Sequence, residues 1–366
     1  MPLSAYQPEC YEDLLVRKTS AHRPAFEALG APEPEIVGSP HEGFRLRVEF
    51  RLWHEGERMF YAMFRPGAPK QPIPIERFPI AAPAIQRLMP KLLAALHTEQ
   101  SLRQKLFQVE FLRTLAGDML VTLIYHRALD EAWTHAATAL AADLEIKLVG
   151  RSRKQKLIIG GDWVQETLQV NDRSYHFKQP EQAFSQPNGK VNEKMLAWAM
   201  AASRGLQGDL LELYCGIGNF TLPMSGCYDR ILATEVSKVA TRAANENLAE
   251  NGIGNVALAR LSAEEMTQAL TGVRPFRRLA SLPVPLEDYR LDTLLVDPPR
   301  AGLDSATLEL ACGFTNVIYI SCNPTTLLEN LGRLTRTHSI DRLAFFDQFP
   351  YTPHLESGVL LRRRGT

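Results

Sequence analysis

Apolar and polar residues alternate along the segment 44–52, which predicts a strand with two unlike faces. One face carries Phe44, Leu46, Val48, Phe50 and Leu52, and the other carries Arg45, Arg47, Glu49 and Arg51. Turn residues at 54–57 and a second apolar segment at 59–64 follow directly. The pattern therefore predicts a β-hairpin with one buried face and one basic face.

The rest of the first half mixes helical and strand patterns. Helical periodicity occurs at residues 11–19, 83–97 and 129–144, and strand-like segments occur at 106–112, 119–125, 146–149 and 157–159. This order predicts an α+β module of mainly antiparallel type. The basic run 151–156 fits a solvated loop, and phosphate binding is its alternative interpretation.

From about residue 186 the pattern changes to strands that alternate with helices. The predicted strands are 210–213, 230–234, 256–259, 291–296 and 317–320, and the predicted helices are 191–202, 237–251 and 263–270. Uninterrupted apolar strands are typical of a parallel sheet covered on both faces by helices. We therefore expect a doubly wound, mostly parallel α/β domain at 181–366, preceded by the α+β domain at 1–180.

Composition limits the possible classes of protein. The chain has 366 residues, enough for two domains, and no uncharged apolar run near 18 residues, so we expect no membrane span. Residues 1–6 do not have the pattern of a signal peptide. The five cysteines are scattered without a C-x-x-C pair, which predicts reduced thiols in the cytoplasm and neither a metal site nor an iron–sulfur cluster. Formal net charge is zero, so composition indicates no general attraction to nucleic acid.

A glycine turn follows the first strand of the second half. Gly216 and Gly218 are separated by one residue, which lets the backbone approach a ligand closely, and Glu235 ends the next strand. A carboxylate there can accept hydrogen bonds from ribose hydroxyls. Thr221 stands where a dinucleotide-binding turn has its third glycine, so a ligand without phosphates, such as S-adenosylmethionine, fits better than NAD. The alternative is an ordinary turn with a surface Glu.

Asp297-Pro298-Pro299-Arg300 follows a later strand and predicts a rigid polar lip at the carboxyl edge of the sheet. In enzymes that methylate exocyclic amino groups the matching segment ends in an aromatic residue, whereas Arg300 stands here. The cysteine that follows a proline at this strand end in RNA cytosine-5 enzymes is also absent. A proline turn with a capping Asp297 remains the simpler interpretation.

Cys322 follows a buried strand and precedes a helix cap, Asn323, and a first helical residue, Pro324. The positive end of a helix dipole contributes about 1 kcal/mol, which predicts a modestly lowered thiol pKa and a larger thiolate fraction. A thiolate beside a methyl donor suits carbon 5 of a pyrimidine, because addition at carbon 6 makes carbon 5 nucleophilic. The alternative is a small buried residue without chemistry.

Such a reaction also needs a base that removes the hydrogen from carbon 5. Glu356 stands immediately before the last apolar strand and is the first candidate, and His354 is the competing one. A solvated Glu side chain at a strand start is the alternative interpretation of Glu356.

Several motifs together resemble the RNA uracil-5 methyltransferases. They are F-S-Q-P-N at 184–188, L-E-L-Y-C-G-I-G-N-F at 211–220, A-T-E at 233–235, D-P-P-R-A-G-L-D at 297–304, I-S-C-N-P at 320–324 and F-D-Q-F-P-Y-T-P-H-L-E-S-G-V at 346–359. The resemblance implies a Rossmann-like methyltransferase domain, Cys322 as nucleophile and Glu356 as general base. It also implies S-adenosylmethionine contacts at Gln186, Tyr214, Gly216, Gly218, Asn219, Glu235 and Asp297.

Relatives that act on ribosomal RNA usually carry a four-cysteine cluster motif, and its absence favours a tRNA substrate. The resemblance then implies methylation of the T-loop uridine at tRNA position 54 by a monomer, with the tRNA-like part of tmRNA as a further substrate. We expect RNA contacts from the first domain and from the edge of the second, at Arg51, Phe107, His126 and Arg300. The alternatives are an rRNA uracil-5 methyltransferase, a tRNA-folding chaperone and an NAD-dependent oxidoreductase.

Overall fold

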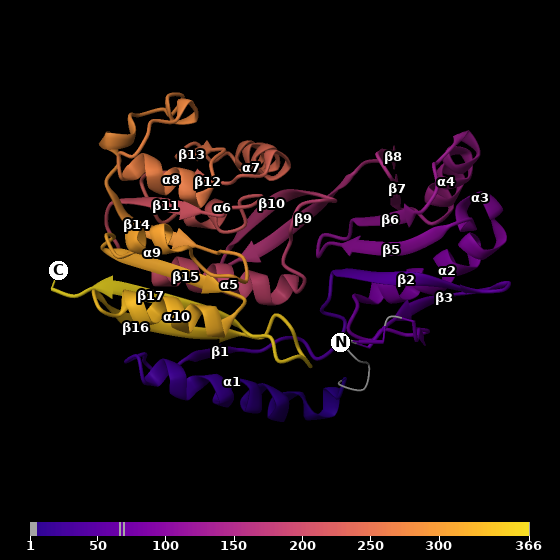
Figure 1. Cartoon of the computed structure of the whole chain (residues 1–366), viewed down its shortest axis with the longest axis horizontal. Coiled ribbons are helices and arrows are strands. Elements are labelled where there is room, and N and C mark those ends of the chain that lie inside the picture. Colours follow the sequence, from indigo (N-terminus) through magenta and orange to yellow (C-terminus); the bar gives the residue numbers. More distant parts are fainter. Residues whose placement is uncertain (1–5, 66, 69, 366) are drawn as a thin grey trace.

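The computed structural model describes residues 6–65, 67–68 and 70–365. The signal-peptide prediction concerned residues 1–6, and residues 1–5 lie outside the described residues. Two β-sheets with their own helices lie next to each other in the molecule (Figure 1). No helix among the described residues is long and apolar enough to cross a membrane.

The larger sheet has eight strands in the order β1-β16-β17-β15-β14-β11-β12-β13. Their bounds are Glu35–Val37 (β1), Asp209–Leu213 (β11), Ile231–Thr234 (β12), Val256–Ala259 (β13), Leu291–Val296 (β14), Asn316–Ser321 (β15), His338–Phe346 (β16) and Glu356–Arg363 (β17). The pairs from β15 through β13 are parallel, and only β17 runs antiparallel to its neighbours β15 and β16. The expected doubly wound, mostly parallel α/β domain is confirmed.

Helices cover both faces of this sheet (Figure 1). They are α5 (Gly189–Ala202), α6 (Thr221–Met224), α7 (Lys238–Glu250), α8 (Ala263–Leu270), α9 (Ser305–Ala311) and α10 (Pro324–Leu334), with single 3₁₀ turns at Arg277–Leu279 and Leu286–Asp288. Leu210 packs with α5 and α7, whereas its neighbour Leu211 packs on the opposite face with α8, α9 and α10. Because successive side chains of a strand point to opposite faces, both faces must be apolar, which explains the uninterrupted apolar strands.

The smaller sheet has seven strands in the order β4-β3-β2-β5-β6-β7-β8. Their bounds are Arg47–Glu55 (β2), Arg58–Met63 (β3), Ile73–Pro74 (β4), Leu106–Arg113 (β5), Met119–Tyr125 (β6), Lys147–Ser152 (β7) and Gln155–Ile159 (β8), and the helices are α2 (Pro83–Thr98), α3 (Gln100–Arg103) and α4 (Glu131–Asp143). Only β6 and β7 pair in parallel. The expectation of a mainly antiparallel α+β module is confirmed.

Residues 11–37 lie below the rest of the larger sheet in the view of Figure 1. The helix expected at 11–19 extends further, as α1 (Tyr11–Glu27), after a 3₁₀ turn at Pro8–Cys10. The strand β1 then pairs in parallel with β16 at the edge of the larger sheet. A domain boundary at residues 180 and 181 stays a prediction, and the pairing shows that the larger sheet also takes a strand from the first 40 residues.

A separate hairpin connects the two halves of the chain. It consists of β9 (Trp163–Val170) and β10 (Arg173–Pro180), and the sequence analysis did not predict it. The strand β9 packs on α5, and β10 packs on α7. The segment that follows the hairpin, residues 182–186, lines a cavity together with Tyr214, Glu235 and Asp297 of the larger sheet.

The basic face predicted for the first hairpin is largely internal. The Arg47 guanidinium donates to the carbonyl oxygens of Glu181 (2.6 Å) and Ala183 (3.0 Å), and Arg45 donates to the carbonyl oxygen of Arg47 (2.9 Å). Arg51 alone of the three is exposed. Two of the three arginines therefore hold backbone together.

The basic run 151–156 is also not a solvated loop. Its ends belong to the paired strands β7 and β8, and only the exposed residues Arg153 and Lys154 form the turn between them. The Arg151 guanidinium donates to both carboxylate oxygens of Glu181, at 2.6 and 2.5 Å. Lys156 lies 3.3 Å from the same carboxylate and 2.7 Å from Asp162. The prediction was wrong because Glu181, its main partner, lies 30 residues away in the sequence.

Candidate active site

The carboxyl ends of the parallel strands bring the predicted site residues together. In the register of the sheet, Leu213 lies beside both Thr234 and Val296. The residues that follow these three, Tyr214, Glu235 and Asp297, therefore emerge side by side at the carboxyl edge. Ligands of open α/β sheets bind at this edge.

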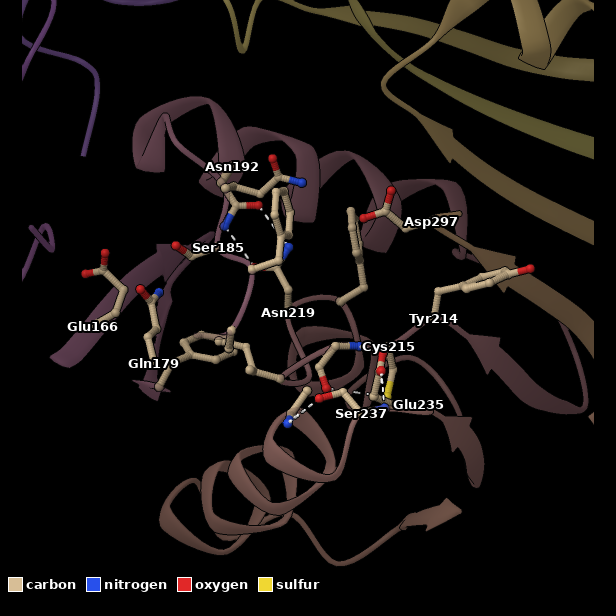
Figure 2. A pocket seen from close by; sticks show the side chains of 18 of the residues that line it. Glu166, Gln179, Ser185, Asn192, Tyr214, Cys215, Asn219, Glu235, Ser237 and Asp297 are labelled. Atoms are coloured by element: carbon tan, nitrogen blue, oxygen red, sulfur yellow. Dashed lines mark hydrogen bonds between the residues drawn. The ribbon is translucent and has the colours of Figure 1, made fainter. Parts of the chain in front are cut away.

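A cavity of about 250 Å³ opens at this edge (Figure 2). Six of the seven residues predicted to hold the cofactor line it: Gln186, Tyr214, Gly216, Asn219, Glu235 and Asp297. The exception is Gly218, where an added Cβ would lie 2.6 Å from Cδ1 of Leu222. With a φ of 91°, Gly218 permits the turn itself.

The turn fixes the orientation of the Glu235 carboxylate. The Gly216 N–H donates to Oε2 of Glu235 (3.1 Å), and the Ser237 N–H donates to Oε1 (2.7 Å). Each carboxylate oxygen can accept a further hydrogen bond. Tyr214 adopts a φ of 62°, a left-handed conformation that is costly for a residue with a Cβ and is found most often at functional sites.

Asn192 is a site residue that the sequence analysis missed. It projects from α5 and exchanges two hydrogen bonds with Asn219, at 2.9 and 3.0 Å (Figure 2). Asn192 is 4% exposed on an otherwise apolar helix face, and a polar residue at such a position could have signalled a role. Ser185, from the F-S-Q-P-N motif, also lines the cavity, as do Glu166 and Gln179, which no motif indicated.

The charge of the lining limits what the cavity can hold. Glu166, Glu235 and Asp297 carry carboxyl groups, whereas no Lys, Arg or His occurs among the described residues that line it. Burial raises the pKa of Asp297 to about 7. A ligand with ribose hydroxyls and positive charge fits this lining, and a pyrophosphate does not. The residues thus fit S-adenosylmethionine.

Cys322 and Glu356 face each other across two antiparallel strands. Ser321 on β15 is paired with Ser357 on β17. This pair is the last of the ladder, and Cys322 and Glu356 each stand one residue beyond it on the same side. The carboxyl group of Glu356 raises the pKa of the Cys322 thiol, which is consistent with the two side chains lying close together. Cys322 is half-buried, whereas Glu356 is 2% exposed.

The pKa expected for Cys322 was wrong in direction. Burial, followed by the carboxyl groups of Glu356 and Asp297, raises the pKa of the Cys322 thiol to about 11, and Arg300 opposes this. Asn323 does cap α10, since its side chain accepts from the Thr325 N–H. The effect of the helix terminus on the thiol pKa is nonetheless too small, because burial and two carboxyl groups destabilise the thiolate by more.

This pKa predicts how Cys322 reacts with an alkylating reagent. Below about pH 11 the thiol stays protonated, so the alkylation rate should rise about tenfold per pH unit between pH 7 and 10. Mass spectrometry of the Cys322 peptide after timed iodoacetamide treatment measures the rate. Arg300→Met should slow alkylation and Glu356→Gln should accelerate it. A plateau below pH 8.5 in the wild type would contradict the assignment.

The Glu356 carboxyl group is placed to exchange a proton. Burial, with a contribution from Asp297, raises the pKa of Glu356 well above its usual range, and Arg300 opposes the shift. Its Oε2 is buried and has no hydrogen-bond partner among the described residues. His354, the competing candidate, is exposed in the loop before β17. The position opposite Cys322 favours Glu356 as the base.

Arg300 lies in a loop that α10 supports. The Asn323 side chain (3.0 Å) and the Thr326 hydroxyl (3.1 Å) both donate to the Arg300 carbonyl oxygen. Its exposed side chain lines a second cavity, of about 600 Å³, with Phe349 and His354 from the loop before β17. Arg45 and Phe78 contribute to the same cavity from the first half of the chain. Arg300 thus faces a space between the two parts of the molecule.

The three other residues predicted to contact RNA form one cluster. The Arg51 guanidinium lies 4.3 Å from the centre of the Phe107 ring, and the His126 ring stacks on Phe107 at 4.2 Å. All three line a shallow cavity of about 280 Å³ on the smaller sheet, to which Arg300 does not contribute. We call Arg51, Phe107 and His126 the stacking cluster.

The sequence analysis predicted neither a metal site nor an iron–sulfur cluster. Among residues 6–65, 67–68 and 70–365, no group of three or more His, Cys, Asp or Glu side chains could hold a metal ion. The five cysteines are free thiols.

Comparisons with known proteins identify the family of this chain. The model of the family described as tRNA (Uracil-5-)-methyltransferase matches residues 10–364. The chain is 53% identical over 365 residues to the tRNA/tmRNA (uracil-C(5))-methyltransferase of Aromatoleum aromaticum, covering 100% of this chain and 99% of that one. It is 54% identical over 364 residues to the protein of the same name from Ectopseudomonas mendocina, covering all of both chains.

Among solved structures, the fold is similar to that of the Pyrococcus abyssi tRNA (uracil-54, C5)-methyltransferase in complex with S-adenosyl-L-homocysteine. The TM-score is 0.71, and the match covers 96% of this chain and 83% of the other. Sequence identity is 18%, so this likeness concerns the fold alone.

Proposed function

Because this chain belongs to the tRNA (uracil-5-)-methyltransferase family, we propose that it methylates carbon 5 of uracil in tRNA with S-adenosylmethionine. The observation that carries the proposal is the register that sets Cys322 opposite Glu356. Both residues interact electrostatically with Asp297, which lines the cavity for the methyl donor. Family membership excludes the oxidoreductase interpretation, which the carboxylate-rich cavity also disfavours.

We propose the T-loop uridine at position 54 as the target, with 5-methyluridine as the product. Relatives more than 50% identical over the whole chain are named as tRNA/tmRNA enzymes, which supports tRNA and the tRNA-like part of tmRNA as substrates. The absence of a four-cysteine motif from the sequence argues against the rRNA alternative.

Cys322 and Glu356 act in different steps of the reaction on uracil. The Cys322 thiol loses its proton to solvent and its sulfur adds to carbon 6, while the electron pair of the C5=C6 bond moves onto carbon 5 and the adjoining carbonyl. Bound S-adenosylmethionine supplies an electrophilic methyl group for carbon 5. Glu356 then takes the proton from carbon 5, the C–H electrons re-form the C5=C6 bond, and the Cys322 thiolate leaves. Transfer of this proton from Glu356 to the Cys322 thiolate then restores the enzyme.

The side chains of the cavity hold the methyl donor in separate ways. Glu235, oriented by two backbone N–H groups, accepts from the ribose hydroxyls. Gln186 and Asn219 offer amide groups, and the two hydrogen bonds with Asn192 fix the orientation of Asn219. Asp297 provides negative charge close to Cys322. The backbone of Gly216 and the strained Tyr214 shape the wall between them.

The T-loop base must leave the tRNA fold before it reaches Cys322. Such an extraction costs a few kcal/mol, which aromatic stacking and phosphate contacts have to offset. We propose that the stacking cluster holds T-arm nucleotides and that Arg300 contacts RNA close to the target base. A preformed Arg51–Phe107–His126 stack offers both a flat surface and positive charge.

Phe107→Ala should weaken tRNA binding. Loss of one aromatic surface costs about 1–3 kcal/mol, so the Kd for unmodified tRNA should rise by about 5- to 150-fold. Filter binding measures tRNA affinity, and calorimetry with S-adenosylmethionine should show no change because Phe107 lies outside that cavity. The matched control is Phe276→Ala, which removes a half-buried ring that stacks on Arg274, away from the stacking cluster. Unchanged tRNA affinity in Phe107→Ala would exclude the cluster.

The decisive test of the proposed function is incubation with labelled S-adenosylmethionine and unmodified tRNA, followed by nucleoside analysis. Label should appear in 5-methyluridine, and tRNA with cytidine at position 54 should remain unlabelled. The chaperone alternative predicts that refolding of denatured tRNA is accelerated without label transfer. Label in rRNA but not in tRNA would overturn the proposed substrate.

A further inference from the structure

One ammonium group holds both ends of the loop that leads into Glu356. This loop, residues 347–355, connects β16 to β17. Lys18 on α1 donates to the Asp347 carboxylate (2.7 Å) at the start of the loop and to the carbonyl oxygen of His354 (3.2 Å) near its end. A third bond, to the carbonyl oxygen of Phe349 (3.0 Å), fixes its middle. We call residues 347–355 the base loop.

The attachment is buried and shared with a second residue of α1. The side chains of Lys18 and Asp347 are 9% and 1% exposed. The Tyr11 hydroxyl donates to the other Asp347 oxygen (3.0 Å) and accepts from the Ser39 N–H (2.7 Å). Burial lowers the pKa of Lys18, and Asp347 opposes the change. A buried ion pair contributes little net stability, so its effect on loop geometry is the more informative property.

The base loop separates α1 from the cavity that Arg300 faces. Lys18 and Asp347 lie with α1 on one side, whereas Phe349 and His354 line the 600 Å³ cavity on the other. Within the loop, Tyr351 adopts a φ of 63°, and its hydroxyl donates to the carbonyl oxygen of His41 (2.6 Å). A strained conformation persists only when its surroundings fix it, and Lys18 supplies three of the fixing bonds.

We infer that Lys18 is a positioning residue for Glu356, through the base loop, in the removal of the proton from carbon 5. The inference deepens the proposed function and rests on it. In that step the C–H electrons re-form the C5=C6 bond, the S–C6 bond breaks, and the proton moves to Glu356. Cys322 is held separately, by β15 and the cap of α10. Loss of Lys18 should therefore slow release of the covalent adduct but not its formation.

The test compares Lys18→Met with Arg17→Met, which changes the exposed neighbour on the same helix. Single-turnover reactions with labelled donor and unmodified tRNA give the rate of label transfer. A denaturing gel gives the fraction of protein bound covalently to RNA. Lys18→Met should keep label transfer within about threefold and slow adduct release by about 10- to 100-fold, as expected for a displaced catalytic group. Arg17→Met should match the wild type.

A double variant keeps the test valid if Lys18→Met alone folds poorly. Lys18→Met leaves the Asp347 charge buried without its cation, and Lys18→Met/Asp347→Asn removes both charges. The double variant should unfold near the wild-type temperature and still release the adduct slowly. Wild-type release in the folded double variant, or an equal loss of label transfer and release, would overturn the positioning role. No adduct and no 5-methyluridine in the wild type would overturn the proposed function and this inference together.

Discussion

Cys322→Ala should lose at least about 10⁴-fold in turnover, because it removes the only group in the proposed chemistry that makes carbon 5 nucleophilic. S-adenosylmethionine affinity should be unchanged, since Cys322 does not line the donor cavity. Affinity for tRNA should also persist, because the stacking cluster lies on the other sheet. Label transfer to tRNA, calorimetry with the donor and filter binding measure these three properties.

The matched control for this variant is Cys312→Ala. Cys312 is also half-buried but ends α9, away from the carboxyl edge that carries Cys322. Its loss should leave the rate of methylation within about twofold of the wild type, as for most substitutions away from a site. Methylation by Cys322→Ala at more than a few per cent of the wild-type rate would exclude a covalent mechanism.

The cofactor side of the site could be predicted because parallel strands obey a simple rule. Their carboxyl ends meet at one edge, so Tyr214, Glu235 and Asp297 are brought together whatever the lengths of the intervening helices. Apolar runs and turn residues were sufficient to place β11, β12 and β14, the strands that these three residues follow. Asn192 could not be found this way, because its role depends on one side-chain pair, with Asn219, that joins a helix to a turn.

The pairing of Cys322 with Glu356 depends on a feature that periodicity does not reveal. The strand β17 enters the sheet antiparallel, between β15 and β16, and only this direction places the start of β17 beside the end of β15. Family resemblance supplied the two roles, and the register supplies the physical reason. The predicted pKa of Cys322 was wrong for the same reason. The helix cap is adjacent to Cys322 in the sequence, whereas the carboxyl groups of Glu356 and Asp297 are distant from it in the sequence.

Local sequence patterns could not predict the contacts between residues that are far apart in the sequence. Lys18 meets Asp347 across 329 residues, and β1 pairs with β16 across a similar distance. The sequence around Lys18 shows only an amphipathic helix, in which a half-buried Lys looks like an ordinary surface residue. The base loop is therefore supported by a part of the chain that the sequence assigned to a different domain.

Glu356→Gln should separate the two halves of the reaction. Glutamine is nearly the same size but cannot take the proton from carbon 5, so the covalent adduct should form and then persist. Turnover should fall by about 10²- to 10⁴-fold, the usual contribution of a general base. Removing the carboxyl group also favours the Cys322 thiolate, because Glu356 raises the pKa of that thiol. Adduct formation should therefore be no slower than in the wild type.

A denaturing gel of Glu356→Gln with labelled tRNA should show a stable protein–RNA band, and nuclease digestion should leave a methylated nucleotide on the Cys322 peptide. His354→Gln is the matched control, since it changes the competing base in the same loop and should release product at close to the wild-type rate. A persistent band in His354→Gln, with none in Glu356→Gln, would assign the proton transfer to the imidazole. Because Glu356 is buried and His354 is exposed, the register opposite Cys322 favours the carboxylate.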